Sequence, residues 1–206
     1  MQERYLGDIH DYFKFIFLKF LSRNLRMKIG LNWYLVNPCT IGIDEVKKND
    51  GEKRNFLLDN AIRKYDKDIA EEFDKFKKKE LRKINRFSEN THLKSYINFF
   101  NEFIDVNDRE NWLKRSLVHH KSENIIFLDP DNGFSLKHKG KFSLKYIFPG
   151  KDFELINSKL LKNKFFWFEK KISEENYEKI MMLGDKSIKP HENLTRVYPQ
   201  KNLFSH

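Results

Sequence analysis

Apolar residues recur at helical spacing near the start of the chain. In YLGDIHDYFKFIFLKFL they stand three or four positions apart, and this periodicity predicts an amphipathic helix. The residues concerned are Tyr12, Phe13, Ile16, Phe17, Phe20 and Leu21. Asp8 precedes the pattern where it can cap the first turn, and Asp11 lies near the positive end of the helix dipole. We therefore expect a helix that begins after Asp8.

Two shorter apolar runs predict buried strands. The first extends from Ile29 to Val36 and is closed by Pro38, and the second extends from Ile125 to Leu128. The second run is apolar on both faces, which is typical of a central strand in a sheet covered by helices. Helical patterns at about 55–87, 92–103 and 109–118 separate the two runs. This alternation predicts an α/β fold over residues 1–148, with a Rossmann-like open sheet covered by helices.

The pattern changes after Pro149. DFELINSKL predicts a short helix, and KFFWF predicts a strand without a polar face. A longer helix is predicted to begin after Ser173, which can cap it, and to end at Gly184. The final LTRVYPQKNLFSH is typical of a strand entering a fold. Residues 149–206 are therefore expected to form a small α+β fragment, separate from the first domain.

Composition narrows the class of protein. The chain has 206 residues, 39% of them hydrophobic, and a net charge of +10. This charge favours nucleic acid or nucleotide partners, although lysines that only fill solvated surfaces would give the same value. Cys39 is the only cysteine, which excludes a disulfide framework and a cysteine zinc site. The longest early apolar run, FIFL, is shorter than a signal peptide or a membrane span needs, so we expect no membrane anchor and a cytoplasmic location.

The main candidate for chemistry is the polar segment that follows the second predicted strand. Asp129, Asp131 and Asn132 stand at the carboxyl end of that strand, where open α/β sheets bind ligands. Two carboxylates two residues apart suit Mg²⁺, so we predict Asp129 and Asp131 as metal ligands and all three residues as catalytic. Lys137 and Lys145 are close enough in sequence to meet a phosphate, Lys137 in catalysis and Lys145 in substrate binding. The alternative is a simple turn, since Asp-Pro-Asp-Asn-Gly is also turn chemistry.

Further polar residues are candidates on other elements. Asp8 and Asp11 share one face at the start of the first helix, with Lys14 one turn on, and we expect both carboxylates to assist catalysis. Helix capping is the alternative for this pair. Substrate-binding candidates are Asn32 and Tyr34 on the first strand and Asp50 in the Asn-Asp-Gly loop. His119 and His120 are interpreted as a surface pair rather than a metal site. Neither glycine-rich phosphate motif occurs.

Residues 4–146 resemble a bacterial and phage-associated family. The similar segments are RYLGDIHDYFKF, GLNWYLV, NDG, IIFLDPDNGF and SLKY. The resemblance implies no particular activity. FLDPDNGF is also distantly similar to the Asp-Pro-Pro-Tyr motif of amino-methyltransferases. It departs from that motif at Asp131-Asn132, and no glycine-rich adenosylmethionine loop follows the first strand.

Residues 150–206 resemble the non-catalytic dimerisation region of class B penicillin-binding proteins. The aromatic strand, the Ser-x-Glu helix start, Arg196, Tyr198, Pro199 and His206 correspond to that pattern. The resemblance implies a fused and truncated piece, with the seam in GKFSLKYIFPGKDFELI. The family's Ser-x-x-Lys, Ser-x-Asn and Lys-Thr-Gly set is missing, so transpeptidase activity is not expected.

Three functions follow as hypotheses. The first is a metal-dependent enzyme that acts on nucleic acid or nucleotide phosphates. The second is a cell-wall transpeptidase fragment that acts by protein contact. The third is a divergent methyltransferase-like domain.

Overall fold

The computed structural model describes most of the first two thirds of the chain. Described are residues 1–48 and 54–132, residues 144, 145, 147 and 152, and the backbone of strands at 165–168 and 196–199. Residues 153–160 of the predicted helix DFELINSKL, and the helix predicted after Ser173, lie outside the described residues.

A five-stranded sheet organises the fold. Its spatial order is β2-β1-β3-β4-β5, and only the last pair is antiparallel. The strands are β1 (Ile29–Asn32), β2 (Ile97–Phe100), β3 (Ile125–Leu128), β4 (Phe165–Phe168) and β5 (Arg196–Pro199). The chain places β2 on one side of β1 and then crosses back to place β3 on the other. The strand that follows β1 along the chain therefore lies on one side of it and the strand that follows β3 lies on the other, and open α/β sheets bind ligands where the strand order reverses in this way.

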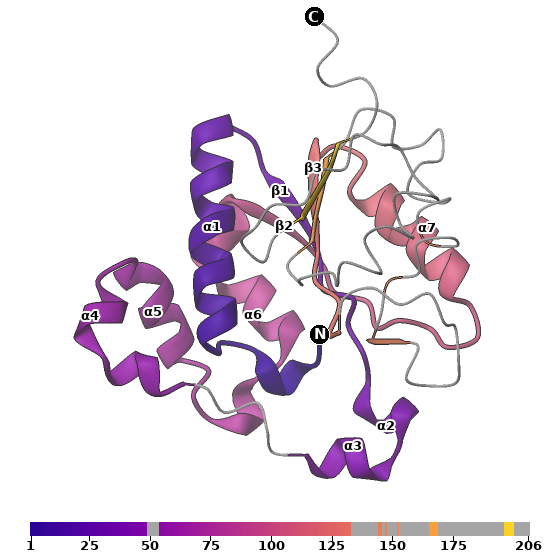
Figure 1. Cartoon of the computed structure of the whole chain (residues 1–206), viewed down its shortest axis with the longest axis horizontal. Coiled ribbons are helices and arrows are strands. Elements are labelled where there is room, and N and C mark those ends of the chain that lie inside the picture. Colours follow the sequence, from indigo (N-terminus) through magenta and orange to yellow (C-terminus); the bar gives the residue numbers. More distant parts are fainter. Residues whose placement is uncertain are drawn as a thin grey trace, which may run out of the picture.

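Helices cover both faces of the sheet, so the chain is an α/β protein. Helix α1 (Ile9–Leu25) lies on one side of β1–β3 and α7 (Arg109–His119) on the other (Figure 1). The chain enters α1 through the short 3-10 helix η1 (Glu3–Tyr5). The connection from β1 to β2 is built from short pieces, namely α2 (Pro38–Ile41), α3 (Ile43–Lys47), η2 (Asn55–Leu58), α4 (Asn60–Arg63), α5 (Lys67–Asp74), η3 (Lys79–Leu81), α6 (Ile84–Asn90) and η4 (His92–Ser95).

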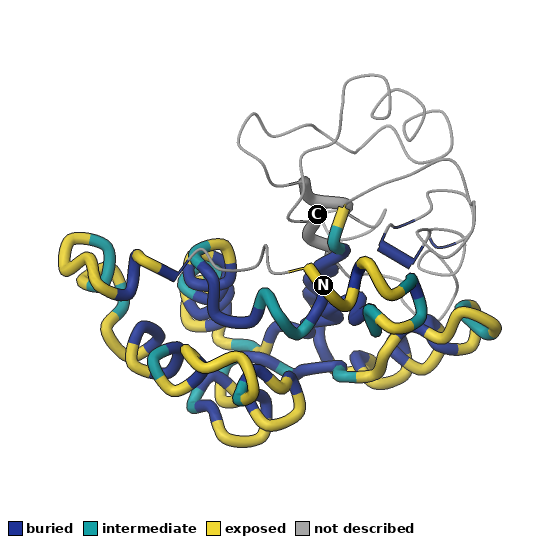
Figure 2. Tube along the Cα trace, turned by 90° about the horizontal axis from the view of Figure 1, so that it is seen from below, coloured by how far each residue is buried: buried dark blue, intermediate teal, exposed yellow. Residues whose placement is uncertain are grey.

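Aromatic side chains fill the core between α1 and the sheet. Phe87 of α6 is fully buried, and its ring centroid lies 5.4 Å from that of Phe15 and 6.0 Å from those of Phe73 and Phe99. Trp33 stacks on Phe99 at 5.9 Å. Buried residues accordingly run through the middle of the molecule, and exposed ones lie on the surrounding turns (Figure 2). The many phenylalanines of the sequence thus supply the main packing of the first domain.

Several predicted elements are confirmed. The helix after Asp8, the helix near 109–118 and the strand at 125–128 are present as α1, α7 and β3. KFFWF contains β4, and the last segment contains β5. Both pair within the same sheet as β3, while the division into domains at residue 148 stays a prediction.

Other elements differ from the prediction. The helix expected at 92–103 is wrong, because only η4 is helical there and Ile97–Phe100 form β2. A four-residue apolar run fits a buried strand and a buried helix equally well, and pairing with β1 decides the matter. The helix expected at 55–87 is divided into five short elements. The strand expected to reach Val36 ends at Asn32, because the chain turns at Tyr34 with φ of 47°.

Gly30 allows a buried histidine to pack directly on β1. A Cβ at this position would lie 2.8 Å from Nδ1 of His120, which is fully buried. We expect Gly30→Ala to lower the free energy of unfolding by about 1–3 kcal/mol, because the ring has to shift within a packed interior. Chemical denaturation of Gly30→Ala, of His120→Ala and of the double variant Gly30→Ala/His120→Ala measures this effect. If the double variant loses as much as the sum of the two single variants, the clash is not the cause.

Candidate functional site

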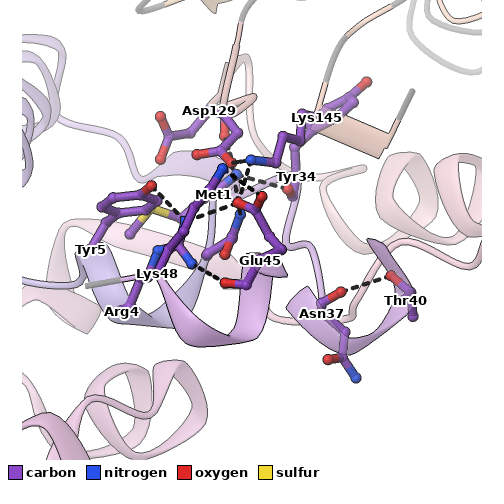
Figure 3. Close-up of polar contacts among 12 residues, drawn as sticks. Met1, Arg4, Tyr5, Tyr34, Asn37, Thr40, Glu45, Lys48, Asp129 and Lys145 are labelled. Carbon is purple, nitrogen blue, oxygen red and sulfur yellow. Dashed lines mark hydrogen bonds and ion pairs between the residues drawn. The ribbon is translucent and has the colours of Figure 1, made fainter. Parts of the chain in front are cut away.

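The candidate site lies where the first residues of the chain meet the carboxyl edge of the sheet. The amino group of Met1 donates to the carbonyl oxygens of Tyr34 at 3.0 Å and of Asp129 at 3.3 Å. It thereby joins the segments that follow β1 and β3. The N-terminus lies at the end of these strands in Figure 1, and Figure 3 shows the surrounding contacts.

A buried ammonium group between two carboxylates forms the centre of the site. Nζ of Lys14 lies 2.6 Å from Oδ1 of Asp11 and 2.7 Å from Oδ2 of Asp129. These three side chains, the Asp11–Lys14–Asp129 triad, are each at most 6% exposed. Nζ also lies 5.2 Å from the Trp33 ring centroid, a cation–π distance. The triad ties the first turns of α1 to the end of β3.

Local sequence explains how Asp11 is positioned. The Asp8 side chain caps α1 by accepting from the Asp11 backbone N–H at 3.0 Å. Gly7 adopts a φ of 77°, a backbone conformation that glycine allows at little cost. Its N–H donates to Oδ2 of Asp11 at 2.8 Å. The Gly-Asp-x-x-Asp spacing therefore turns the second carboxylate toward Lys14.

Burial and the neighbouring charges shift the pKa of Asp11 upward. Burial raises its pKa to about 6, and the neighbouring carboxylates of Asp8 and Asp129 add to this, while Lys14 opposes it. A carboxyl group that titrates near pH 6 can accept a proton close to neutral pH. Such displaced pKa values are concentrated at functional sites, although structural ion pairs also produce them.

A second charged cluster surrounds Glu45 of α3. Its carboxylate accepts from Lys145 at 2.6 Å, from Lys48 at 2.9 Å and from Arg4 and Gln2 at 2.9 Å each (Figure 3). Burial alone would raise the pKa of Glu45, but these donors lower it below the ordinary value. Glu45 is therefore ionised and holds the cations of this cluster in place.

Asp131 connects this cluster to the end of β3. Its Oδ2 accepts from Nε2 of Gln2 at 3.1 Å and lies 3.4 Å from Nζ of Lys145. Lys145 therefore lies beside the Asp-Pro-Asp segment, and the backbone N–H of Asn132 donates to the Lys145 carbonyl. The predicted role of Lys145 in substrate binding stays a prediction. The Asn132 residue is exposed.

Asn32 and Tyr34 organise the end of β1. The amide of Asn32 donates to Oγ of Ser116 at 2.6 Å and accepts from the Tyr34 N–H at 2.8 Å. The Tyr34 ring is buried, with the Arg109 guanidinium 5.6 Å from its centroid. Burial raises the pKa of Tyr34 well above its ordinary value, and the negative charge of Asp152 adds to this shift. The positive charge of Arg109 opposes it. The side-chain amide of Asn32 is engaged within the protein, and its predicted contact with substrate stays a prediction.

The structure brings together most of the predicted site residues and adds others. Asp11, Asp129, Asp131 and Lys145 lie along one edge, whereas Asp8 serves as a helix cap, as its alternative interpretation held. Lys137 and Asp50 lie outside the described residues. Sequence reasoning noted Lys14 without giving it a role. It missed Gln2, Glu45 and the Arg109–Asp152 ion pair of 2.7 Å, for which no local motif gave a signal.

Metal-binding features are limited in the described part of the chain. No group of three or more His, Cys, Asp or Glu side chains there is arranged around one point. Asp129 and Asp131 each face an ammonium group, so Mg²⁺ at this pair stays a prediction. The interpretation of the two histidines as a surface pair is wrong for His120, which is fully buried, while His119 is exposed.

Comparison of the chain with protein-family models, with curated proteins and with solved structures finds no match. Both family resemblances therefore stay predictions. Among the helices that the structure describes, none has the length and apolar character required to cross a membrane.

Proposed function

We propose that the chain is a phosphate-directed enzyme that acts on nucleotide or nucleic acid phosphates. The observation that carries the proposal is the buried Asp11–Lys14–Asp129 triad at the carboxyl edge of parallel strands β1 and β3. The strand order β2-β1-β3 supports a Rossmann-like arrangement, in which ligands bind at this edge. The fold alone would not assign a function, and the proposal rests on the chemistry of the site.

The proposed reaction is hydrolysis of a phosphate ester. Water attacks phosphorus and gives its proton to the Asp11 carboxylate, while the bond to the leaving oxygen breaks and that oxygen takes a proton from solvent. The ammonium groups of Lys14 and Lys145 face the negative charge of the phosphoryl group. Mg²⁺ held by Asp129 and Asp131 would polarise a phosphoryl oxygen. The triad is almost fully buried, so the phosphate has to enter beside Asp131, which keeps 11% side-chain exposure.

Substitution of the two triad carboxylates tests the proposal. Asp11→Asn is expected to lower the rate of hydrolysis at least about 100-fold, as loss of a general base does. Asp129→Asn is also expected to lower it, because it removes a proposed metal ligand and a charged partner of Lys14. The rate is measured with the full chain on a labelled oligonucleotide, on ATP and on bis(p-nitrophenyl) phosphate, with and without Mg²⁺. The wild-type rate should rise as pH increases through about 6, because Asp11 acts in its ionised form.

Asp66→Asn is the matched control. Asp66 caps α5 and pairs at 2.7 Å with Lys19, which belongs to α1 as Lys14 does. Asn preserves a helix cap. This variant should keep the wild-type rate. Triad variants that retain full activity, or a chain without activity on any of these substrates, would contradict the proposal. Calorimetry with Mg²⁺ on wild-type and Asp131→Asn protein decides separately whether the metal is involved.

A further inference from the structure

A basic groove lies directly beside the candidate site. It is a pocket of about 230 Å³ between η1, the end of α3 and the η3 segment. Five cationic residues line it, namely Arg4, Lys48, Lys79, Arg82 and Lys83. Only two acidic residues, Glu3 and Glu80, line the same pocket. The groove therefore carries an excess of positive charge.

Existing ion pairs reduce this excess without removing it. Lys83 pairs with Glu3 at 2.9 Å, while Lys48 and Arg4 both pair with Glu45 at 2.9 Å. The Arg82 side chain donates at 3.2 Å to the carbonyl of Phe76 and is held by the η3 segment. Lys79 is exposed, and the described residues give it no ion-pair partner. Counting Glu45 with the lining acids, five positive charges face three negative ones.

The groove is continuous with the candidate site. Gln2 lines the groove, and its amide donates to the carboxylates of Asp131 and Glu45. Lys75, Lys77 and Lys78, which immediately precede the groove residues in the chain, are also exposed, although Lys75 pairs with Glu72 at 3.0 Å and Lys77 with Asp74 at 2.7 Å. Such an extended run of cations suits a chain of phosphates better than the two or three charges of a single nucleotide.

We infer that this groove binds the phosphodiester backbone of a single-stranded nucleic acid and guides it toward Asp131. Lysine and arginine side chains contact backbone phosphates regardless of base sequence, and positively charged grooves of this kind follow the backbone of a single strand. This inference rests on the proposed function, because it names the substrate class for the same site. It concerns binding, which is measured independently of hydrolysis.

Charge reversal at the two lysines of the η3 segment tests the inference. The full-length Lys79→Glu/Lys83→Glu variant is compared with wild type by fluorescence anisotropy of a labelled 12-residue oligothymidylate. Loss of two phosphate contacts should reduce the slope of log K against log salt by about 1.4 and weaken binding about 20-fold at 0.1 M salt. An oligouridylate should bind as well as oligothymidylate, because contacts to the backbone do not read the sugar.

Lys28→Glu/Lys94→Glu is the matched control. Both lysines are exposed and lie just before β1 and β2, at the opposite end of the sheet. This variant has the same net charge as the groove variant and should lose much less affinity. Thermal melting confirms that both variants are folded.

The outcomes separate this inference from the proposed function. Equal losses of affinity in the two variants would mean that only net charge matters. Tighter binding of ATP or of duplex than of the single strand would assign another ligand to the groove. Either result overturns the inference that the groove binds a single strand. If Asp129→Asn retains activity while Lys79→Glu/Lys83→Glu loses binding, the inference that the groove binds nucleic acid is supported and the proposed reaction is contradicted.

Discussion

Lys14→Met is expected to lower the free energy of unfolding by about 3–5 kcal/mol, because it leaves two buried carboxylates without their shared cation. Asp11 and Asp129 each lie within 2.7 Å of the Lys14 ammonium. Met has nearly the same length, so the loss reflects charge rather than a large cavity. Denaturant titration monitored by circular dichroism measures the change.

The raised pKa of Asp11 determines how the loss of stability in Lys14→Met depends on pH. Burial raises the folded-state pKa of Asp11 to about 6 from its ordinary 3.8. A carboxyl group with a raised pKa favours the folded state below its unfolded pKa, and this contribution is lost as pH rises through the folded value. Without Lys14 the carboxylates are harder still to ionise. The deficit of Lys14→Met should therefore be larger at pH 8 than at pH 5.

Two comparisons isolate the charge effect. Lys114→Met removes a lysine that also pairs within its helix, with Glu110 at 2.7 Å, but both side chains are exposed. It should change stability by less than about 1 kcal/mol. The triple variant Lys14→Met/Asp11→Asn/Asp129→Asn should recover much of the lost stability, since none of these three buried positions is then charged. A triple variant no more stable than Lys14→Met would show that the ammonium acts through packing.

Phe87→Ala is expected to lower the free energy of unfolding by a similar amount, about 3–5 kcal/mol. Phe87 is fully buried, and its ring centroid lies within 6.4 Å of the Trp33 centroid and of those of four other phenylalanines. Removing it opens a cavity that α1, α5, α6 and the sheet all border. Thermal and urea unfolding measure the loss.

Phe20→Ala is the control for this variant. Phe20 belongs to the same apolar pattern of the sequence but is 59% exposed in the structure. Its replacement should change stability by no more than about 0.5 kcal/mol. Equal losses at the two positions would mean that the assignment of Phe87 to the core and Phe20 to the surface is wrong.

Much of the fold follows from local pattern. Residues 9–25 and 109–119 form helices because their periodicity and polar starts agree with one conformation. The strand at 125–128 was also predicted, because its apolar run is followed directly by Asp-Pro-Asp-Asn-Gly, a turn sequence that ends the run. β2 could not be predicted, because Ile97–Phe100 is too short to show a period and becomes a strand only by pairing with β1.

The candidate site was predictable only in part. The prediction that polar residues follow a buried strand placed Asp129 and Asp131 at the end of β3, where the structure has them, while their catalytic role stays a prediction. Glu45 gave no signal, because it follows an ordinary helix start, and its four donors come from three separate parts of the chain. Burial of the site, which sets the pKa of Asp11, is likewise a property of packing rather than of sequence spacing.

The sequence by itself determined the elements whose cause is local. These include the capped start of α1 at Asp8, the amphipathic helices and the apolar strand that ends at Leu128. Only the tertiary structure decided which of these elements meet. Lys14 reaches Asp129 across 115 positions and Lys145 reaches Glu45 across 100. Helix periodicity and caps depend on neighbours within a few residues, so the sequence determines them locally. These ion pairs depend instead on the order of the strands in the sheet, which only the folded chain fixes.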